Sequence, residues 1–111
     1  MNRSEVPRSL QQALAEMKQA LSGLYGEQLR GLYLYGSYAR GTAHEGSDVD
    51  VLVVLADPIK PGAEITRMNP VISAICLRYD ILISLYPVSA QGLETRRNPF
   101  LENVCNEAVP L

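Results

Sequence analysis

The first third of the chain carries an apolar pattern that repeats every three or four residues. Gln, Glu and Lys lie between its members, which are Leu10, Leu14, Met17, Leu21 and Leu24. This spacing predicts an amphipathic helix over 10–24, because such residues share one helical face. Its start is expected at a Ser9 cap or near Pro7. Its end is expected at Gly23 or Gly26, since glycine accepts a left-handed backbone conformation.

Two apolar runs that follow are typical of strands. Residues 32–35 read LYLY and end at Gly36, which predicts a buried strand that leads into a tight turn. After a polar loop, alternation over 48–55 places Asp48 and Asp50 on one face together with Leu52 and Val54. The opposite face then holds Val49, Val51, Val53 and Leu55. A second strand is therefore predicted to begin with two carboxylates side by side.

A second helix is predicted after turn-forming residues at 57–62. Its apolar members alternate by three and four and are Ile65, Met68, Ile72, Ile75 and Tyr79. Pro70 lies inside this pattern, where it removes a backbone donor and clashes with the preceding turn. We therefore expect a break there, or a restart of the helix with Asn69 as its cap.

The rest of the chain predicts one more strand and one more helix. Residues 81–86 read ILISLY and predict a third strand that stops at Pro87, with Asp80 at its leading edge. Asn98 and Pro99 predict the cap and the first residue of a final helix. Its apolar members, which can pack back onto the sheet, are Phe100, Leu101, Val104 and Ala108.

Together these elements predict an α/β (α+β) fold, in which a small mixed β-sheet is packed with helices. Their order is helix, strand, loop, strand, helix, strand, helix, without a repeat or a linker. The chain has 111 residues, of which 47% are apolar and 20% charged, enough for one modest core. We therefore expect a single domain over 1–111, with no room for a second, substrate-binding domain.

Charge and cysteine usage make several classes of function unexpected. Ten basic and twelve acidic residues give a net charge of −2 without a long basic run, so autonomous nucleic-acid binding is not expected. No apolar run approaches the ~20 residues that span a bilayer, and the polar start lacks a signal core, so we expect a cytoplasmic protein. Cys76 and Cys105 form no CxxC pair and only one histidine accompanies them, which indicates buried free thiols.

The chemistry concentrates between residues 36 and 50. Gly36 removes a β-carbon where a strand turns, so nearby amides and the Ser37 hydroxyl can bind a phosphate. Asp48 and Asp50 supply hard oxygen ligands for Mg²⁺, which takes its other ligands from water and substrate phosphates. Each half also has an ordinary interpretation, as a tight turn or as solvated carboxylates. The combination favours a metal and triphosphate site, because two adjacent carboxylates repel each other unless a cation neutralises them.

Other polar residues of this stretch are secondary candidates. Arg40 can pair with a phosphate or with a partner protein, or be an ordinary surface charge. Ser47 can donate to a phosphate or cap the turn before Asp48. Tyr38 can stack on a base. His44, the only histidine, is expected to be a solvated loop residue.

This motif of Gly-Ser, ten residues and then Asp-x-Asp resembles the signature of the polymerase-beta-type nucleotidyltransferase superfamily, most closely its minimal (MNT) branch. The resemblance covers nearly the whole chain and implies a nucleotidyltransferase fold. It implies that Gly36 and Ser37 hold the triphosphate, and that Asp48 and Asp50 bind the metal. Asp80 matches a third carboxylate, which shares the metal and helps to deprotonate the attacking hydroxyl.

The resemblance also implies a reaction and a partner. An acceptor hydroxyl would attack the α-phosphorus of a nucleoside triphosphate, with Mg²⁺ as cofactor and ATP as donor. Within the MNT branch it implies an antitoxin that attaches AMP to a tyrosine of a HEPN-type ribonuclease toxin. Two alternatives stay open: a non-catalytic antitoxin that neutralises the toxin by binding, or a transferase for a small molecule or RNA that a separate subunit supplies.

Overall fold

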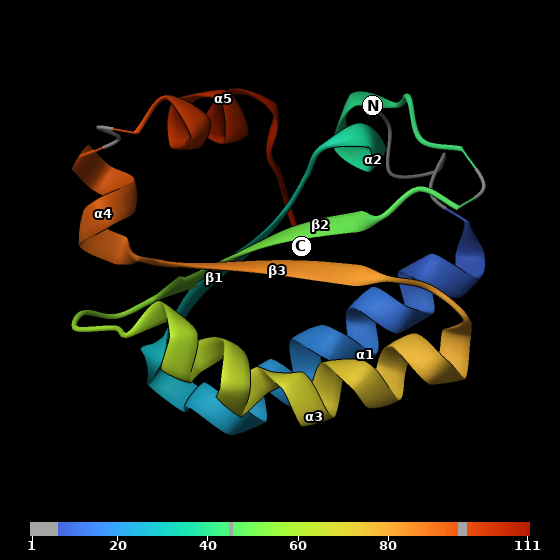
Figure 1. The fold of residues 1–111 in the computed structure, drawn as a ribbon, viewed down its shortest axis with the longest axis horizontal. Helices are drawn as coiled ribbons and strands as arrows, with labels where there is room; N and C mark the ends of the chain where they lie inside the picture. Colours follow the sequence, from blue (N-terminus) through green and yellow to red (C-terminus); the bar gives the residue numbers. More distant parts are fainter. Residues whose placement is uncertain (1–6, 45, 96–97) are drawn as a thin grey trace.

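A four-stranded mixed β-sheet forms the centre of the molecule (Figure 1). The computed structural model describes residues 7–44, 46–95 and 98–111. The strands lie in the order β3-β2-β1-β4 and are β1 (Leu29–Tyr35), β2 (Val49–Leu55), β3 (Ile83–Ser89) and β4 (Val109–Pro110). β1 runs antiparallel to β2 and to β4, whereas β2 and β3 run parallel. The predicted small mixed sheet packed with helices is confirmed.

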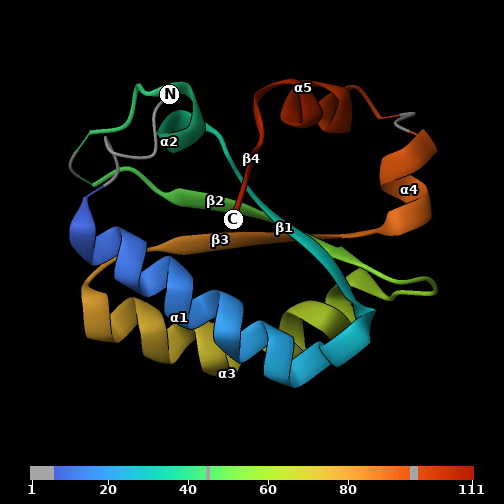
Figure 2. The ribbon, with the colours of Figure 1, turned by 180° about the vertical axis from the view of Figure 1, so that it is seen from behind.

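The helices lie in two layers on either side of this sheet. The long helices α1 (Arg8–Tyr25) and α3 (Pro61–Tyr79) lie side by side over one face (Figures 1 and 2). The short helices α2 and α5 lie on the opposite side. The remaining bounds are η2 Gly26–Gln28, α2 Ser37–Arg40, α4 Ala90–Thr95 and α5 Pro99–Glu107.

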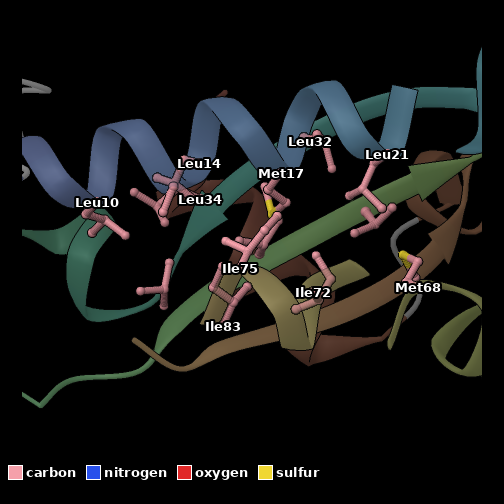
Figure 3. Packing of buried hydrophobic residues seen from close by; sticks show 14 of the residues in the cluster. Leu10, Leu14, Met17, Leu21, Leu32, Leu34, Met68, Ile72, Ile75 and Ile83 are labelled. Carbon is pink, nitrogen blue, oxygen red and sulfur yellow. The ribbon is translucent and has the colours of Figure 1, made fainter. Parts of the chain in front are cut away.

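The larger core fills the space between the sheet and the two long helices (Figure 3). Its labelled members are Leu10, Leu14, Met17 and Leu21 of α1, Leu32 and Leu34 of β1, Met68, Ile72 and Ile75 of α3, and Ile83 of β3. Met17, Leu21 and Met68 are completely buried. Burial of one such side chain stabilises a fold by about 1.5–3 kcal/mol. This packing fixes the sheet whose strand ends carry the candidate site.

Strand β2 faces two cores through the alternation of its side chains. Those that face the α1–α3 layer are Val49, Val51, Val53 and Leu55. Leu52 and Val54 pack in a smaller cluster with Val88, Leu101 and Val104. The predicted alternation is therefore confirmed. Asp50 shares the face of Leu52, so its carboxylate lies on the side of α5.

The observed course of the two long helices agrees only in part with that predicted from the sequence. Pro7 occupies the N-cap position of α1 without a side-chain cap, so the Ser9 alternative is wrong, whereas Gly26 ends the helix with a φ of 58°. α3 is continuous, so the predicted break at Pro70 is wrong. Pro70 lies on the exposed side of α3. Its missing N–H frees only the carbonyl of exposed Thr66, which water can satisfy.

Strand β3 begins two residues later than predicted and continues through Pro87, where a stop was predicted. Pro87 is tolerated because β3 is an edge strand, so a missing N–H on its free side removes no ladder bond. The late start also changes the place of Asp80. That residue is the C-cap of α3 in a left-handed conformation, with a φ of 54°, rather than the first residue of a strand.

The C-terminal segment contains one predicted helix and two unpredicted elements. Asn98 caps α5 as predicted, since its Oδ1 accepts from the backbone N–H of Phe100 at 2.8 Å. The short helix α4 follows β3 directly. Strand β4 pairs with β1 through Val109 opposite Leu34 and Pro110 opposite Tyr33. This pairing returns the end of the chain to the sheet, where β4 forms the edge next to β1.

Two further expectations concern the thiols and the membrane. Cys76 and Cys105 are free, but both are partly exposed, so their predicted burial is wrong. In the described parts of the chain, no helix combines the length and the apolar character needed to cross a membrane.

Candidate active site

The Gly36 turn lies directly against the carboxylate of Asp50. Antiparallel pairing sets Tyr35, the last residue of β1, opposite Asp50 near the start of β2. Gly36 then turns the chain with a φ of 76°. A β-carbon built on Gly36 would lie 2.3 Å from Oδ2 of Asp50. Only glycine fits here, because both the backbone angle and the approach exclude a side chain.

Helix α2 follows this turn as a single helical turn. The N–H of Arg40 donates to the carbonyl of Gly36 at 3.0 Å, and the N–H of Thr42 donates to that of Ser37 at 3.0 Å. The first amides of a helix lack partners within it, so they are available to an anion. Half-buried Ser37 adds a hydroxyl at the same point. The turn and the first residues of α2 can therefore bind a phosphate beside Asp50.

Asp48 and Asp50 differ in their surroundings. Asp48 is exposed just before β2, whereas Asp50 is half-buried within it. Burial raises the pKa of Asp50, and the negative charges of Asp48 and Glu107 raise it further, whereas the guanidinium of Arg40 lowers it. The positive charge of Arg40 therefore does not fully offset the cost of ionising Asp50. The pair fits Mg²⁺, which one or two carboxylates bind together with water and substrate phosphates.

Asp80 does not lie beside these two carboxylates in the strand register. The residue of β3 opposite Asp50 is Ser84, and Asp80 precedes the strand as the exposed C-cap of α3. Asp80 lines a cavity of about 470 Å³ together with Tyr38 and His44. Among the residues that the structure describes, no group of three or more His, Cys, Asp or Glu side chains is arranged to hold a metal.

Ser47 closes the loop before β2. Its Oγ accepts from the N–H of His44 at 2.9 Å, and its own N–H donates to the carbonyl of His44 at 2.9 Å. This is the local turn contact that was one of two interpretations of Ser47. The loop thereby brings the chain back from α2 to Asp48.

Glu107 is a site residue that the sequence did not single out. It ends α5, and its Oε2 accepts from Nη1 of Arg40 at 2.9 Å. The only available signal was its place at the end of a predicted helix, which does not indicate that α5 ends over α2. The ion pair adds a carboxylate from the C-terminal segment to the surroundings of Asp50.

An aromatic group lies next to the carboxylates on the same face of the sheet. Phe100 of α5 packs edge-on against Tyr35, with ring centres 5.9 Å apart, and its ring is tilted against that of Tyr86, with centres 5.0 Å apart. Burial, followed by the charge of Asp50, raises the pKa of Tyr35 to about 12. Tyr35 therefore stays neutral near the site at physiological pH.

Comparison with known proteins identifies the family to which this arrangement belongs. The family described as "Nucleotidyltransferase domain" matches residues 14–83, more than half of the chain. The chain belongs to the nucleotidyltransferase domain family. This nucleotidyltransferase is similar to a Methanocaldococcus jannaschii protein named "Putative protein adenylyltransferase MJ0141", with 34% identity over 96 residues, 86% of this chain and 92% of that protein.

Solved structures are similar to the nucleotidyltransferase over most of its length. One, a "putative minimal nucleotidyltransferase", shares 27% identity at a TM-score of 0.60 and covers 92% of this chain and 95% of its own. Another is a crystal structure of a toxin-antitoxin with AMP-PNP. It shares 25% identity at a TM-score of 0.57 and covers 85% of this chain and 68% of its own. The nucleotidyltransferase fold implied by the sequence is confirmed.

Proposed function

We propose that this nucleotidyltransferase moves AMP from ATP to a protein hydroxyl in a Mg²⁺-dependent reaction. The observation that carries the proposal is the contact of the Gly36 turn with Asp50, which joins a phosphate-binding turn to a metal-type carboxylate. The name of the adenylyltransferase relative and the AMP-PNP of the toxin-antitoxin structure support AMP transfer from ATP.

Each residue of the site has a distinct part in this proposal. Ser37 and the first amides of α2 bind the triphosphate, and Arg40 adds a positive charge beside them. Asp48 and Asp50 would hold Mg²⁺, which when bound neutralises charge that develops on the α-phosphate and the departing pyrophosphate. Asp80 stays a predicted third carboxylate that accepts the proton of the acceptor hydroxyl.

For the acceptor, we propose a tyrosine of a HEPN-type toxin, with this chain as its antitoxin. The toxin-antitoxin structure supports a paired partner. The cavity of about 470 Å³ that Asp80 lines with Tyr38 and His44 has room for an acceptor side chain of another molecule. AMP on the toxin would remove its activity.

Incubation of the chain with a HEPN-type toxin, Mg²⁺ and ATP labelled at the α-phosphate tests this proposal. Label should appear on the toxin, and the double variant Asp48→Asn, Asp50→Asn should abolish it. Asp57→Asn is a matched control, because Asp57 lies beyond the opposite end of β2 and its acceptor role toward the N–H of Gln91 is kept by an amide oxygen. Labelling that persists in the double variant would refute the proposal.

Neutralisation by binding alone is the second candidate. One observation favours it, namely that Ser84 rather than a carboxylate lies opposite Asp50 on β3. Under this alternative, the Asp48→Asn, Asp50→Asn variant would still protect cells from the toxin. Under the catalytic proposal, that variant loses its protection while it still folds.

A further inference from the structure

A charged contact joins helix α2 to the end of helix α5. Arg40 and Glu107 are 67 residues apart in the chain, and their side chains meet at 2.9 Å. The Arg40 side chain is 53% exposed and that of Glu107 is 22% exposed, so the carboxylate is the more enclosed partner. Both helices lie on the face of the sheet away from α1 and α3 (Figures 1 and 2).

The backbone around Glu107 is anchored on both sides. Before it, Leu101 and Val104 of α5 are buried against the sheet in the smaller core. After it, β4 pairs with β1, and the N–H of Leu111 donates to the carbonyl of Leu32 at 2.9 Å. The backbone that carries Glu107 is therefore held in place on both sides, whereas Arg40 has a long and flexible side chain.

Arg40 lies where its charge reaches both carboxylates. The N–H of Arg40 donates to the carbonyl of Gly36 at 3.0 Å, and Gly36 lies directly against the carboxylate of Asp50, so Arg40 lies close to Asp50 as well as to Glu107. A guanidinium has five N–H donors in a planar fork. The contact with Glu107 is made by Nη1, which leaves donors for a second anion. An anion bound beside Asp50 at the Gly36 turn would be within the reach of these donors.

We propose that Glu107 is a positioning residue, which holds Arg40 beside Asp50 so that its guanidinium contacts a phosphate of the nucleotide. The inference rests on the proposed function, in which ATP binds at the Gly36–Ser37 turn. Ordering Arg40 in advance reduces the entropy that the side chain loses when the nucleotide binds.

Equilibrium binding of ATP with Mg²⁺ to the whole chain tests this role. Glu107→Gln should weaken binding about 2- to 10-fold, the range expected when one long side chain has to be ordered on binding. Arg40→Gln should weaken binding at least as much. Glu102→Gln is the matched control, because Glu102 is exposed on the same helix, and it should bind like the wild type.

The double variant separates positioning from a merely structural effect. Because Glu107 acts through Arg40, Glu107→Gln should cause no further loss in the Arg40→Gln background. The melting temperatures should stay close to that of the wild type, since an exposed ion pair contributes little stability. Additive losses of ATP binding in the double variant would overturn the inference. If the wild type binds ATP, unchanged or tighter binding by Glu107→Gln would also overturn it. A wild type that binds no ATP would overturn the proposed function and this inference with it.

Discussion

Asp50 occupies the space that a side chain at residue 36 would need, since a β-carbon on Gly36 would lie 2.3 Å from its Oδ2. The turn proposed to hold the triphosphate and the carboxylate proposed to hold the metal are therefore one structural unit. A change at Gly36 must displace Asp50 or the backbone of α2.

Gly36→Ala should destabilise the chain and abolish ATP binding. The φ of 76° costs a residue with a side chain about 1–3 kcal/mol, and the displaced Asp50 adds to this. Urea unfolding and ATP binding measure the two effects. Gly23→Ala is the control, because Gly23 lies inside α1 with nothing within 4 Å of an added β-carbon. It should stabilise the chain by about 0.5–1 kcal/mol and bind ATP normally. Normal binding by Gly36→Ala would refute the close contact.

Asp50→Asn should make the chain without nucleotide more stable at pH 7. The folded pKa of Asp50 is raised above its ordinary value of 3.8, so the stabilising effect of the protonated form is complete below pH 3.8 and is lost as the pH rises. Asparagine keeps the neutral state at every pH. Thermal unfolding should therefore show a gain at pH 7 that shrinks toward pH 4.

The matched control for this measurement is Glu94→Gln, which also removes one negative charge but from the exposed surface of α4. It should change stability little at either pH. A loss of stability in Asp50→Asn at pH 7 would contradict the raised pKa of Asp50 in the folded state.

Ser84→Asp should place a third carboxylate next to Asp50 on β3. The parallel register sets these two residues side by side on one face. Without a cation the added charge should lower the melting temperature, because it repels Asp50. Mg²⁺ should then raise the melting temperature more than it does in the wild type. Ser73→Asp on the exposed face of α3 is the control, and an equal Mg²⁺ effect in both variants would count against a metal at Asp50.

Tyr25 should make the stability of the fold sensitive to alkaline pH. Its hydroxyl donates to Oε1 of Glu64 at 2.9 Å, and burial together with Glu64 raises its pKa to about 12. Because the folded pKa exceeds the ordinary value of 10, the stabilisation is complete below pH 10 and is lost as the pH rises through 12. Tyr25→Phe should cost about 0.5–1.5 kcal/mol at pH 7.

Between pH 10 and 12, the Tyr25→Phe variant should lose less stability than the wild type. Chemical unfolding at several pH values measures this difference. Glu64→Gln keeps an acceptor for the hydroxyl but removes the charge, so the folded pKa of Tyr25 should be lower, and the loss of stability above pH 10 should be smaller and end at a lower pH than in the wild type. Identical pH profiles for wild type and Tyr25→Phe would contradict the contribution of this contact.

The sequence predicts those features of the fold that depend on local periodicity. The helical spacing from Leu10 and the alternation after Asp48 are both found, because burial on one face imposes them directly. The breaks predicted at Pro70 and Pro87 are wrong because the local sequence does not show whether a backbone N–H is needed at a given position. A proline is disruptive only where its missing N–H is needed, and both residues lie where it is not.

The candidate site is predictable only where its residues are close in the chain. Gly36, Ser37, Asp48 and Asp50 belong to one motif, and the pairing of β1 with β2 brings the turn and Asp50 together. Glu107 reaches the site because β4 returns to β1, a long-range pairing of two residues that leaves no periodic pattern. The position of Asp80 depends on where α3 ends, which no local signal sets to within one turn.

Calorimetric titration of the chain with ATP, in the presence and absence of Mg²⁺, tests the central claim most directly. We predict saturable binding by the wild type that depends on Mg²⁺, and its loss in Asp50→Asn although that variant stays folded. ATP binding of equal strength in wild type and Asp50→Asn, or binding indifferent to Mg²⁺, would contradict a nucleotide and metal site at Gly36 and Asp50.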